Sequence, residues 1–468
     1  MNAPAKRSWG QALATYARGR VVGMLFLGFS AGLPFLLVFS TLQFWLAEAG
    51  YDPKTIAFAT WIGLTYSIKV FWAPVIDRVR LPMLTARMGR RRSWMLLAML
   101  GIATGLVGMA LTDPKQNLAV MALFALLVAF SSATQDVALD AYRIEAVDQD
   151  LQGAMAAMYQ LGYRLAVLVA GAGALYFAQW ASWTTSYLIM AACTLVGIVT
   201  IFLVREPEVT RDDTAHQREA RVVAFVARNP SMNPRLRAAI AWFLGAVVCP
   251  FVDFFSRQGS IAIVILIFIT LFRLSDITLG SMATKFYFDL GFTKTEVADV
   301  VKIFGFFATI AGAFAGGIAV ARFGIMRPMV VAAVLISAGN LLFAWLAGIG
   351  HSLPMLATVI SADNFAGGFA GSAFIAYLSS LTSAAYTATQ YALFSSLMTF
   401  TGKIVGGFSG WIAESLGLVV QGGKVLNPAA YANFFIYSAA VGIPSIGLAL
   451  YLAWRMRAAE RMRAPQAG

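Results

Sequence analysis

The stretch "VAFSSATQDVALDAYRIEAV", residues 128–147, places polar side chains at helical spacing inside an otherwise apolar part of the chain. Ser132, Asp136 and Asp140 are four residues apart and therefore share one face of a helix, with Gln135 in a second row beside them. In water such a stripe costs little. In a lipid bilayer, ionisable side chains must face protein or a water-filled cavity. The meaning of the stretch therefore depends on whether the chain lies in a membrane.

Composition answers this first question. Of the 468 residues 59% are hydrophobic and only 12% are charged, and the mean hydropathy is +0.73. Soluble domains are about one quarter charged. Apolar runs of about 20 residues, the length needed to cross ~30 Å of hydrocarbon, recur along the whole chain. The sequence predicts an all-α polytopic membrane protein, with an uncleaved first helix rather than a short, cleavable signal.

The apolar runs predict twelve transmembrane helices. Their ranges are 21–46, 55–76, 93–112, 118–142, 153–178, 184–204, 260–286, 295–321, 327–348, 353–380, 388–416 and 431–454. An even number of spans places both termini on the same side of the membrane.

The distribution of basic residues predicts which side this is. Lys and Arg gather at the N-terminus, in the loops after even-numbered helices and in the C-terminal tail, whereas the other loops contain only Lys54, Lys115, Lys294 and Lys424. By the positive-inside rule both termini are cytoplasmic. The net charge of +13 is spread over alternate loops in this way, which argues against a nucleic-acid partner and for a lipid bilayer.

The central segment, residues 205–259, begins with the charged run "REPEVTRDDTAHQREAR" and then becomes partly apolar. Its residues 238–256 admit two interpretations. A thirteenth span would reverse the sidedness of everything that follows. A helix on the cytoplasmic membrane surface would not, and we favour it because the stretch is short and contains Pro250 and Asp253.

Two segments indicate an internal repeat. "EAGYDPKTIA" (48–57) and "DLGFTKTEVA" (289–298) align at a shift of about 240 residues, and nearly the same shift pairs Arg164 with Lys403. The sequence therefore predicts two six-helix halves, 1–204 and 260–468, as in the major facilitator superfamily. Dense glycines, as in "GAFAGGIA" (312–319), predict close helix packing.

Several ionisable or amide side chains fall near the middle of the predicted spans, and such groups are functional candidates. They are Arg164, Arg273, Asp276, Asp363, Asn364 and Lys403. Cations outnumber carboxylates in this set, which suits a substrate that carries a carboxylate or phosphate. The alternative is that neighbours such as Arg273 and Asp276, or Asp299 and Lys302, only neutralise each other.

Asp136 is a candidate for proton coupling. It lies deeper in the apolar zone than Asp140, which is close to cytoplasmic water, and Lys69 or Arg164 is a candidate cation near it. A carboxylate whose surroundings change during transport can take up a proton on one side and release it on the other. The alternative is a fixed hydrogen bond to Ser132. Asp276 and Asp363 are the next candidates for this role.

The loop after the second predicted helix reads "APVIDRVRLPMLTARMGRRRSW" (73–94) and resembles the signature of the major facilitator superfamily. In that family its charges lock helix ends together in one conformational state. The resemblance implies a gating role for Asp77, Arg78, Arg90 and Asp140. The alternative is plain anchoring by positive charge.

Enzyme signatures give no competing assignment. "GFSAG" (28–32) matches the G-x-S-x-G nucleophile pattern but lacks the strand-turn-helix context. The sequence contains no metal-binding or Walker signature, so we expect no metal, no cofactor and no catalytic residues. A membrane enzyme would need acid, base or metal-ligating groups near one interface, whereas the polar groups here gather at mid-depth.

Several segments together resemble the AmpG-type muropeptide permeases, in order and over nearly the whole chain. They are "FSAGLP" (29–34), "YSIKVFWAPVIDR" (66–78), "GRRRSW" (89–94), "SATQDVALDAY" (132–142), "LGYRL" (161–165), "DNFAGGFAGSAFIAY" (363–377) and "TATQYALFSS" (387–396). That family imports anhydro-muropeptides across the inner membrane of Gram-negative bacteria with the proton gradient. Related permeases carry acetyl-coenzyme A, which leaves another organic anion as the alternative substrate.

The resemblance also implies roles for individual residues in a monomeric carrier of protons and a glycan or peptide substrate. Arg164, Arg273 and Lys403 would pair with carboxylates of the stem peptide, and Lys69 would also face the substrate. The sugar hydroxyls and acetamides would be hydrogen-bonded by Gln43, Gln135, Tyr163 and Asn364.

Overall fold

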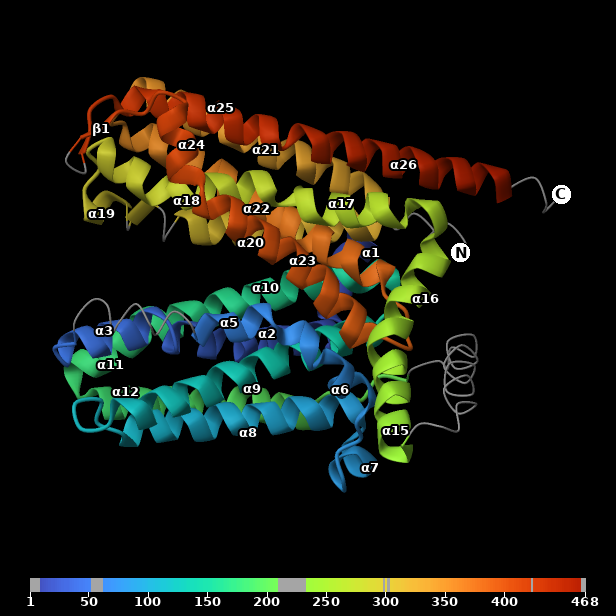
Figure 1. Ribbon diagram of the computed structural model, residues 1–468. Coiled ribbons are helices and arrows are strands. Elements are labelled where there is room, and N and C mark those ends of the chain that lie inside the picture. The colour runs from blue at the N-terminus through green and yellow to red at the C-terminus, as the bar shows by residue number, and fades with distance from the viewer. Residues whose placement is uncertain are drawn as a thin grey trace.

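The computed structural model describes residues 9–51, 62–208, 233–297, 299–300, 304–421 and 424–463. The helices that precede residue 204 form a first bundle (Figure 1). Their bounds are α1 Trp9–Ala14, η1 Thr15–Ala17, α2 Gly19–Leu37, α3 Ser40–Glu48, α5 Leu64–Ser67, η3 Lys69–Phe71, α6 Ala73–Arg78, α7 Leu84–Met88, α8 Arg90–Leu111, α9 Leu118–Glu145, η4 Gln149–Leu151, α10 Gln152–Leu168, η5 Val169–Gly173, α11 Ala174–Trp180, α12 Trp183–Cys193 and α13 Leu195–Leu203.

The helices from residue 262 onward form a second bundle beside the first (Figure 1). Their bounds are α17 Ala262–Phe272, α18 Leu274–Asp289, α19 Lys294–Val297, α20 Gly305–Phe323, α21 Met326–Ile349, α22 Leu353–Leu381, α23 Thr387–Gly407, α24 Ser409–Ser415, η9 Pro428–Ala430, α25 Tyr431–Val441 and α26 Ile443–Arg463. Two short antiparallel strands, β1 Val420–Gln421 and β2 Lys424–Val425, pair in the connection after α24.

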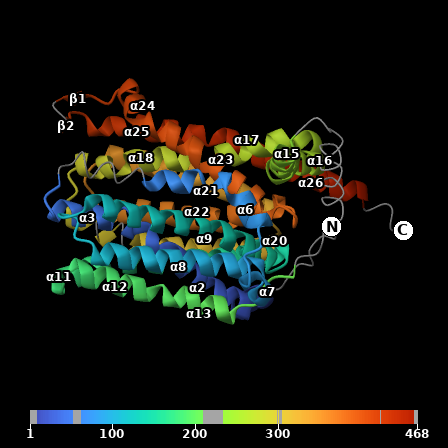
Figure 2. The same ribbon diagram turned by 60° about the horizontal axis from the view of Figure 1, so that its bottom comes forward.

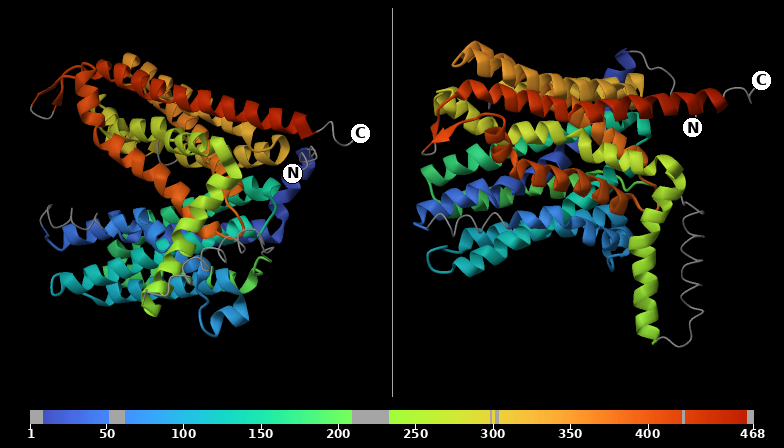
Figure 3. Two further views of the ribbon diagram at one scale, coloured as in Figure 1. Left: turned by 45° about the vertical axis from the view of Figure 1, so that its right-hand side comes forward. Right: turned by 45° about the horizontal axis from the view of Figure 1, so that its top comes forward.

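In the sequence, four helices connect the first bundle to the second: α15 (Pro234–Phe243), η6 (Leu244–Val248), α16 (Cys249–Gln258) and η7 (Gly259–Ile261). We call α15, η6 and α16 the crosswise segment, because they run across the end of the molecule while the bundle helices run along its length (Figures 1 and 3). Exposed apolar side chains such as Trp242, Phe243 and Phe251 lie along its apolar run 238–252. The placement of this segment on the membrane surface stays a prediction.

The two bundles meet at one end of the molecule and diverge toward the other (Figures 1 and 3). Helix α1 and the end of α26 lie at the end where the bundles meet, which we call the termini end. Figure 2 shows from another side that the crosswise segment lies at this same end. Both ends of the described chain are therefore on one side of the bundles, as an even number of spans requires.

Helix α10 of the first bundle packs directly against α20 and α22 of the second. Two glycines allow this approach. A Cβ on Gly153 of α10 would lie 2.8 Å from Val320 Cβ and 2.9 Å from the Gly317 carbonyl of α20. A Cβ on Gly317 would in turn lie 2.7 Å from the Gly153 carbonyl. The expectation of close helix packing at the glycine-rich stretch 312–319 is met here by backbone contact between the bundles.

Several long helices are interrupted where the sequence predicts a continuous span. The apolar run 260–286 breaks at Arg273, whose backbone (φ −101°, ψ 4°) ends α17 and begins α18. The run 21–46 breaks at Val38 and Phe39, after Pro34 within α2. Discontinuous helices in transporters free backbone groups at the substrate site, so the break at Arg273 is of functional interest.

The fold is that of a polytopic all-α membrane protein, as predicted. Nine helical segments of the described chain are long and apolar enough to cross a membrane. Helices α22 and α23 are not among them, since residues such as Asp363 and Asn364 and many Gly, Ser and Thr lower their hydropathy. The count of twelve spans stays a prediction, as do the boundaries 1–204, 205–259 and 260–468. Residues 55–61 of the second predicted helix and Lys302 lie outside the described residues.

We predict that the crosswise segment does not cross the membrane. Fluorescent reporters that mature only in the cytoplasm, fused after Asn233 and after Gln258, should give equal signals. A fusion after Phe323 should match them, and a fusion after Ile349, at the far end of α21, should be dark. Opposite signals from the Asn233 and Gln258 fusions would establish a thirteenth span.

Candidate functional site

A cavity of about 200 Å³ lies between the two bundles. Its walls come from α2, α5, η3, α9 and α10 of the first bundle and from α23 of the second. The lining residues are Ala31, Phe35, Tyr66, Lys69, Asp136, Tyr163, Ser395, Ser396 and Thr399. Aromatic rings and hydroxyls alternate around one cation and one carboxylate, a combination that suits a polar ligand with apolar faces.

Lys69 and Asp136 form an ion pair inside this cavity, with Lys69 Nζ 3.8 Å from Asp136 Oδ2. The short helix η3 presents Lys69, and the polar stripe of α9 presents Asp136. The two side chains are only 14% and 19% exposed. At this separation the two charges attract each other but do not form a short hydrogen bond. A proton can therefore compete with Lys69 for the Asp136 carboxylate, and an anionic ligand can compete with Asp136 for Lys69.

The polar residues of the segment 128–147 therefore have two different roles. Asp136 faces the cavity, whereas Gln135 is fully buried and donates a hydrogen bond from Nε2 to Ser30 Oγ on α2 at 2.7 Å. In this conformation the donor group of Gln135 is used to join α9 to α2 rather than to line the cavity.

A second charged cluster belongs to the second bundle. Arg273, at the break between α17 and α18, pairs with Asp276 in the first turn of α18. Asp363 of α22 is close enough to interact electrostatically with both. Next to it, the Asn364 amide oxygen accepts from Thr309 Oγ1 at 3.0 Å, which joins α22 to α20. The residue at the break therefore takes part in the charged cluster through its side chain.

Arg164 of α10 faces this cluster from the first bundle. Its side chain is exposed, and its charge is near enough to Arg273 for the two guanidinium groups to repel each other. Within the described part of the chain it makes no ion pair. Lys403, its predicted counterpart, lies in α23, and its side chain is outside the described residues. Gln43 lies on α3, away from the lining of the cavity.

At the termini end, Asp77 of α6 connects the two bundles. Its carboxylate accepts hydrogen bonds from the backbone N–H groups of Ala388 (3.1 Å) and Thr389 (2.7 Å) and from Thr389 Oγ1 (2.7 Å), all at the start of α23. These N–H groups have no partner within α23, because the first turn of a helix leaves its donors unsatisfied. A residue of one bundle therefore caps a helix of the other.

Arg91 holds this carboxylate in place. Its guanidinium is 1% exposed and lies 2.8 Å from Asp77 Oδ1 and 2.5 Å from Glu145 Oε1. Arg90 donates to the backbone carbonyl of Asp77 and lies 4.0 Å from Glu145. The predicted gating pair Asp77 and Arg90 thus lies at the contact between the bundles, together with two residues that sequence reasoning missed, Arg91 and Glu145.

A carboxylate from outside the spans fixes the start of α8, the helix that carries these arginines. Glu206 accepts from the backbone N–H groups of Arg91 at 2.7 Å and Arg92 at 3.0 Å. Burial raises the pKa of the Glu206 carboxyl, and the two N–H groups partly oppose this by stabilising the charged form. Its side chain occupies the space that a Cβ on Gly89 would take.

Arg143 makes a second connection between the bundles. It pairs with Asp140 at 3.3 Å, and its Nη1 donates to Ser379 Oγ of α22 at 2.9 Å. Its guanidinium also lies over the ring of Tyr391 on α23, 5.1 Å from the ring centroid. Asp140, predicted to gate, therefore acts on the contact through Arg143. The helical spacing of the pair is visible in the sequence, but its partners on α22 and α23 are not.

The crosswise segment contacts the same region. Gln390 of α23 donates from Nε2 to Asp253 Oδ2 at 3.0 Å and to the Pro250 carbonyl at 2.9 Å. Arg257 pairs with Asp253 at 2.8 Å. Arg78, the remaining predicted gating residue, lies against η6, where a Cβ on Gly245 would be 2.9 Å from its Nη1. The segment thus touches both bundles at the termini end.

Two bundles joined at one end, with charged side chains facing the space between them, are the architecture of a secondary transporter. The profile of the Major Facilitator Superfamily matches residues 24–407. A variant of the Escherichia coli fucose:proton symporter has the same fold, with a TM-score of 0.63, 13% identity, and coverage of 95% of this chain and 99% of that one.

Two relatives narrow the assignment. A Rickettsia felis protein named as transporter AmpG 4 is 32% identical over 92% of this chain and 96% of its own. The anhydromuropeptide permease of Escherichia coli K12 is 32% identical over 94% of this chain and 81% of its own. The chain belongs to the major facilitator superfamily and, within it, to the AmpG family. It is a transporter and not an enzyme.

We predict that Asp77→Asn weakens the closed contact at the termini end. Removing one partner of a buried ion pair costs about 3–5 kcal/mol, which is enough to shift a conformational equilibrium more than a hundredfold. Spin labels on Arg87→Cys and Met456→Cys, with Cys193 and Cys249 replaced by Ser, should show a larger population of long distances, and uptake should fall at least tenfold.

The matched control is Asp113→Asn, at the opposite end of the bundle, where the carboxylate accepts from the Lys115 backbone N–H and makes no contact with the second bundle in the described part of the chain. It should leave both the distances and the uptake unchanged. If Asp77→Asn gave the same distance distribution as the parent protein, the contact would not depend on this carboxylate.

Proposed function

We propose that this transporter imports anhydro-muropeptides, that is, GlcNAc-anhydroMurNAc with or without its stem peptide, from the periplasm to the cytoplasm together with protons. The cell would reuse them for its wall. The observation that carries the proposal is Arg164, an exposed cation of the first bundle that forms no ion pair within the described part of the chain, whereas Arg273 of the second bundle is already paired with Asp276. An unpaired guanidinium facing the other bundle favours an anionic ligand, and a stem peptide supplies carboxylates.

The direction of transport follows from the sidedness. By the positive-inside rule we assign the termini end to the cytoplasm. The bacterial origin of the AmpG relatives supports a location in the inner membrane. In the present conformation the contacts of Asp77 and Arg143 join the bundles at this end. The conformation is then the one that receives substrate from the periplasm.

The sugar part of such a substrate has hydroxyl and acetamide groups above apolar ring faces. Tyr66, Tyr163 and Phe35 line the central cavity, and Ser395 and Thr399 add hydroxyls from the other bundle. Asn364 and Gln43 do not line this cavity in the present conformation, and their assignment to sugar recognition rests on the sequence resemblance alone. The name of the Escherichia coli relative supports the same substrate class.

Proton coupling is assigned first to Asp136. Its partner Lys69 sits on the short helix η3, between α5 and α6 of the same bundle, so that a local shift of these short helices against α9 changes the 3.8 Å separation. The Asp136 carboxylate would take up a proton while the cavity faces the periplasm. It would form the ion pair with Lys69 again after it releases the proton to the cytoplasm. Asp276 and Asp363 form a second carboxylate pair around Arg273 and are the next candidates.

Uptake of radiolabelled GlcNAc-anhydroMurNAc and of its peptide-bearing form tests the function directly. Cells that lack their own permease should accumulate both when they express this chain, and an uncoupler should abolish the accumulation. Accumulation of an acyl-coenzyme A instead, with no uptake of either glycan, would assign the carrier to another organic anion.

We predict that Arg164→Gln raises the half-saturation concentration for the peptide-bearing substrate about tenfold or more, as expected for the loss of one charge-assisted contact. The concentration for a disaccharide whose lactyl carboxylate is blocked as an amide should change less than threefold. Lys403→Gln should show the same difference between the two substrates. Equal increases for both would remove charge recognition from the assignment of these residues.

We predict that Asp136→Asn abolishes accumulation driven by an imposed pH gradient but leaves exchange of substrate between the two sides of preloaded vesicles largely intact. An amide keeps the shape of the carboxylate and cannot bind the coupling proton. Exchange in the same vesicles is the control for folding and substrate binding. If the variant still concentrates substrate, Asp276 or Asp363 carries the proton.

A further inference from the structure

A second cavity lies on the outside of the second bundle, in the groove between α21 and α26. It measures about 560 Å³. Helix α21 contributes Arg327 and Val330 to its wall, and α26 contributes Leu450, Ala453, Trp454 and Arg457. None of the helices that line the central cavity takes part, so the groove is separate from the space between the bundles.

The sequence builds this groove by helical periodicity. Arg327 and Val330 are three residues apart on α21, and Leu450, Ala453, Trp454 and Arg457 follow at intervals of three, one and three on α26. Each set therefore lies on one face of its helix, with its basic residue toward the termini end. The groove is apolar along its length and cationic at that end.

Among the side chains that the structure describes, the cationic end of the groove has no acidic counterpart. Both guanidinium groups are exposed, and within the described part of the chain neither forms an ion pair or a hydrogen bond. The described residues that line the cavity include no carboxylate. The first turn of α21 begins at Met326, so its unsatisfied N–H groups add positive potential next to Arg327. The end of the groove is therefore complementary to an anion.

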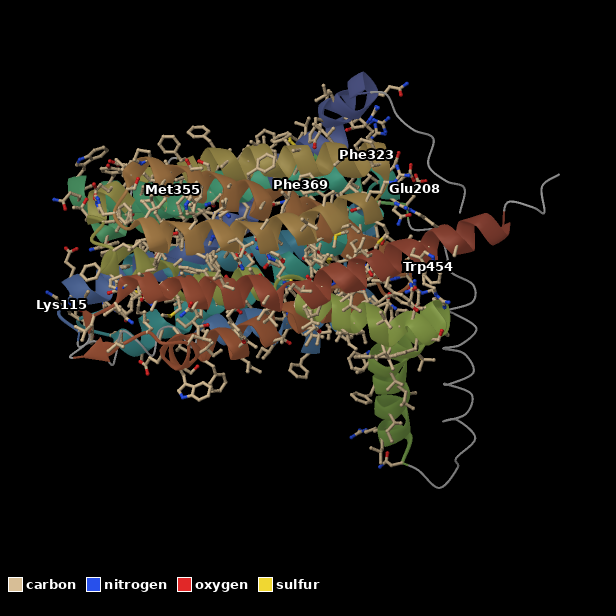
Figure 4. The ribbon with its side chains drawn as sticks, turned by 90° about the horizontal axis from the view of Figure 1, so that it is seen from above. Lys115, Glu208, Phe323, Met355, Phe369 and Trp454 are labelled. Carbon is tan, nitrogen blue, oxygen red and sulfur yellow. The ribbon has the colours of Figure 1, made fainter. Side chains whose placement is uncertain are left out.

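The depth of the groove identifies the anion. Arg327 stands at the start of the membrane-length segment Met326–Ile349, and Arg457 stands with Arg455 in the basic last part of α26, which ends at Arg463. Both therefore lie where hydrocarbon gives way to lipid headgroups. Trp454, 62% exposed near the termini end of α26 (Figure 4), is the residue type enriched at this boundary.

We propose that this groove binds an anionic glycerophospholipid from the leaflet at the termini end. The lipid phosphate pairs with Arg327 and Arg457, and an acyl chain lies along Val330, Leu450 and Ala453. A free phosphate would use only the two arginines. The apolar wall below them, continuous with exposed Val334 and Tyr451 on the lipid-facing surface, favours a ligand with a hydrocarbon tail.

Lipid binding to the purified, delipidated full-length protein in detergent tests the proposal. Native mass spectrometry with added phosphatidylglycerol should show a bound lipid that phosphatidylethanolamine does not replace at equal concentration. The double variant Arg327→Gln/Arg457→Gln should bind phosphatidylglycerol on the order of thirtyfold more weakly, from the loss of two basic groups at a membrane surface. Arg455→Gln, exposed on the same helix but outside the groove, should bind within twofold of the parent protein.

Two further measurements separate a lipid from a free anion. Trp454→Ala should also weaken phosphatidylglycerol binding, because the ring covers the apolar wall. Inorganic phosphate should compete far less well than a short-chain phosphatidylglycerol. Equal binding by the double variant and the Arg455→Gln control would overturn the site, and equally effective competition by phosphate would assign it to a soluble anion.

Discussion

The contact between the two bundles depends on a helix cap that one bundle supplies to the other. Helix α23 begins at Thr387 and exposes backbone donors that its own hydrogen bonds cannot satisfy. The buried carboxylate of Asp77 satisfies two of them from α6, and Arg91 and Glu145 neutralise and position that carboxylate. If the bundles separate here, the backbone donors of α23 and the carboxylate of Asp77 lose each other at the same time. Water must then reach both groups at once. This makes the contact a switch with two states rather than a surface that slides.

The charged groups at mid-depth face a related constraint. An ion pair in a bundle interior is stable only while its partners remain together, and a single charge left behind is costly. Lys69 and Asp136 both belong to the first bundle, and Arg273 and Asp276 both belong to the second. Movement of the bundles therefore need not break either pair. Arg164 differs, because its neighbour Arg273 lies on the other bundle. In the proposed mechanism an anionic substrate supplies the partner that Arg164 lacks in the described part of the chain, which ties closure of the bundles to a bound ligand.

Much of the fold follows from patterns that are visible in the sequence. Apolar runs of membrane length, the alternation of basic loops and the repeat between residues 48–57 and 289–298 predict a two-bundle membrane protein of this superfamily. The breaks in the helices do not follow from them, since an apolar run looks the same whether its backbone is continuous or interrupted. Arg273 shows this limit: the sequence predicts a charge within a span, while its position at a helix break depends on packing between α17, α18 and their neighbours.

The site divides in a similar way. Asp77 and Arg90 could be predicted from the motif in the loop 73–94, and the pairing of Asp140 with Arg143 from helical spacing. Arg91 could not be distinguished from its neighbours Arg90 and Arg92, because three consecutive residues on a helix point in different directions and only the tertiary structure decides which is buried. Gln135 lies in a polar stripe that is visible in the sequence. The stripe does not reveal that the side chain bonds to Ser30 on α2 instead of lining the cavity.

Helix α23 joins the two parts of the site. Thr389 and Gln390 near its start hold the contact at the termini end, and Ser396 and Thr399 line the central cavity. Thr389 and Ser396 are seven residues apart, about 10 Å along the helix at 1.5 Å per residue. No loop lies between the cavity wall and the contact at the termini end, because both belong to the same helix. A ligand that shifts α23 at Ser396 therefore also strains the cap at Asp77 and the bond between Gln390 and the crosswise segment. Binding of a ligand in the central cavity can thus change the contact at the termini end, because the rigid helix α23 carries residues of both.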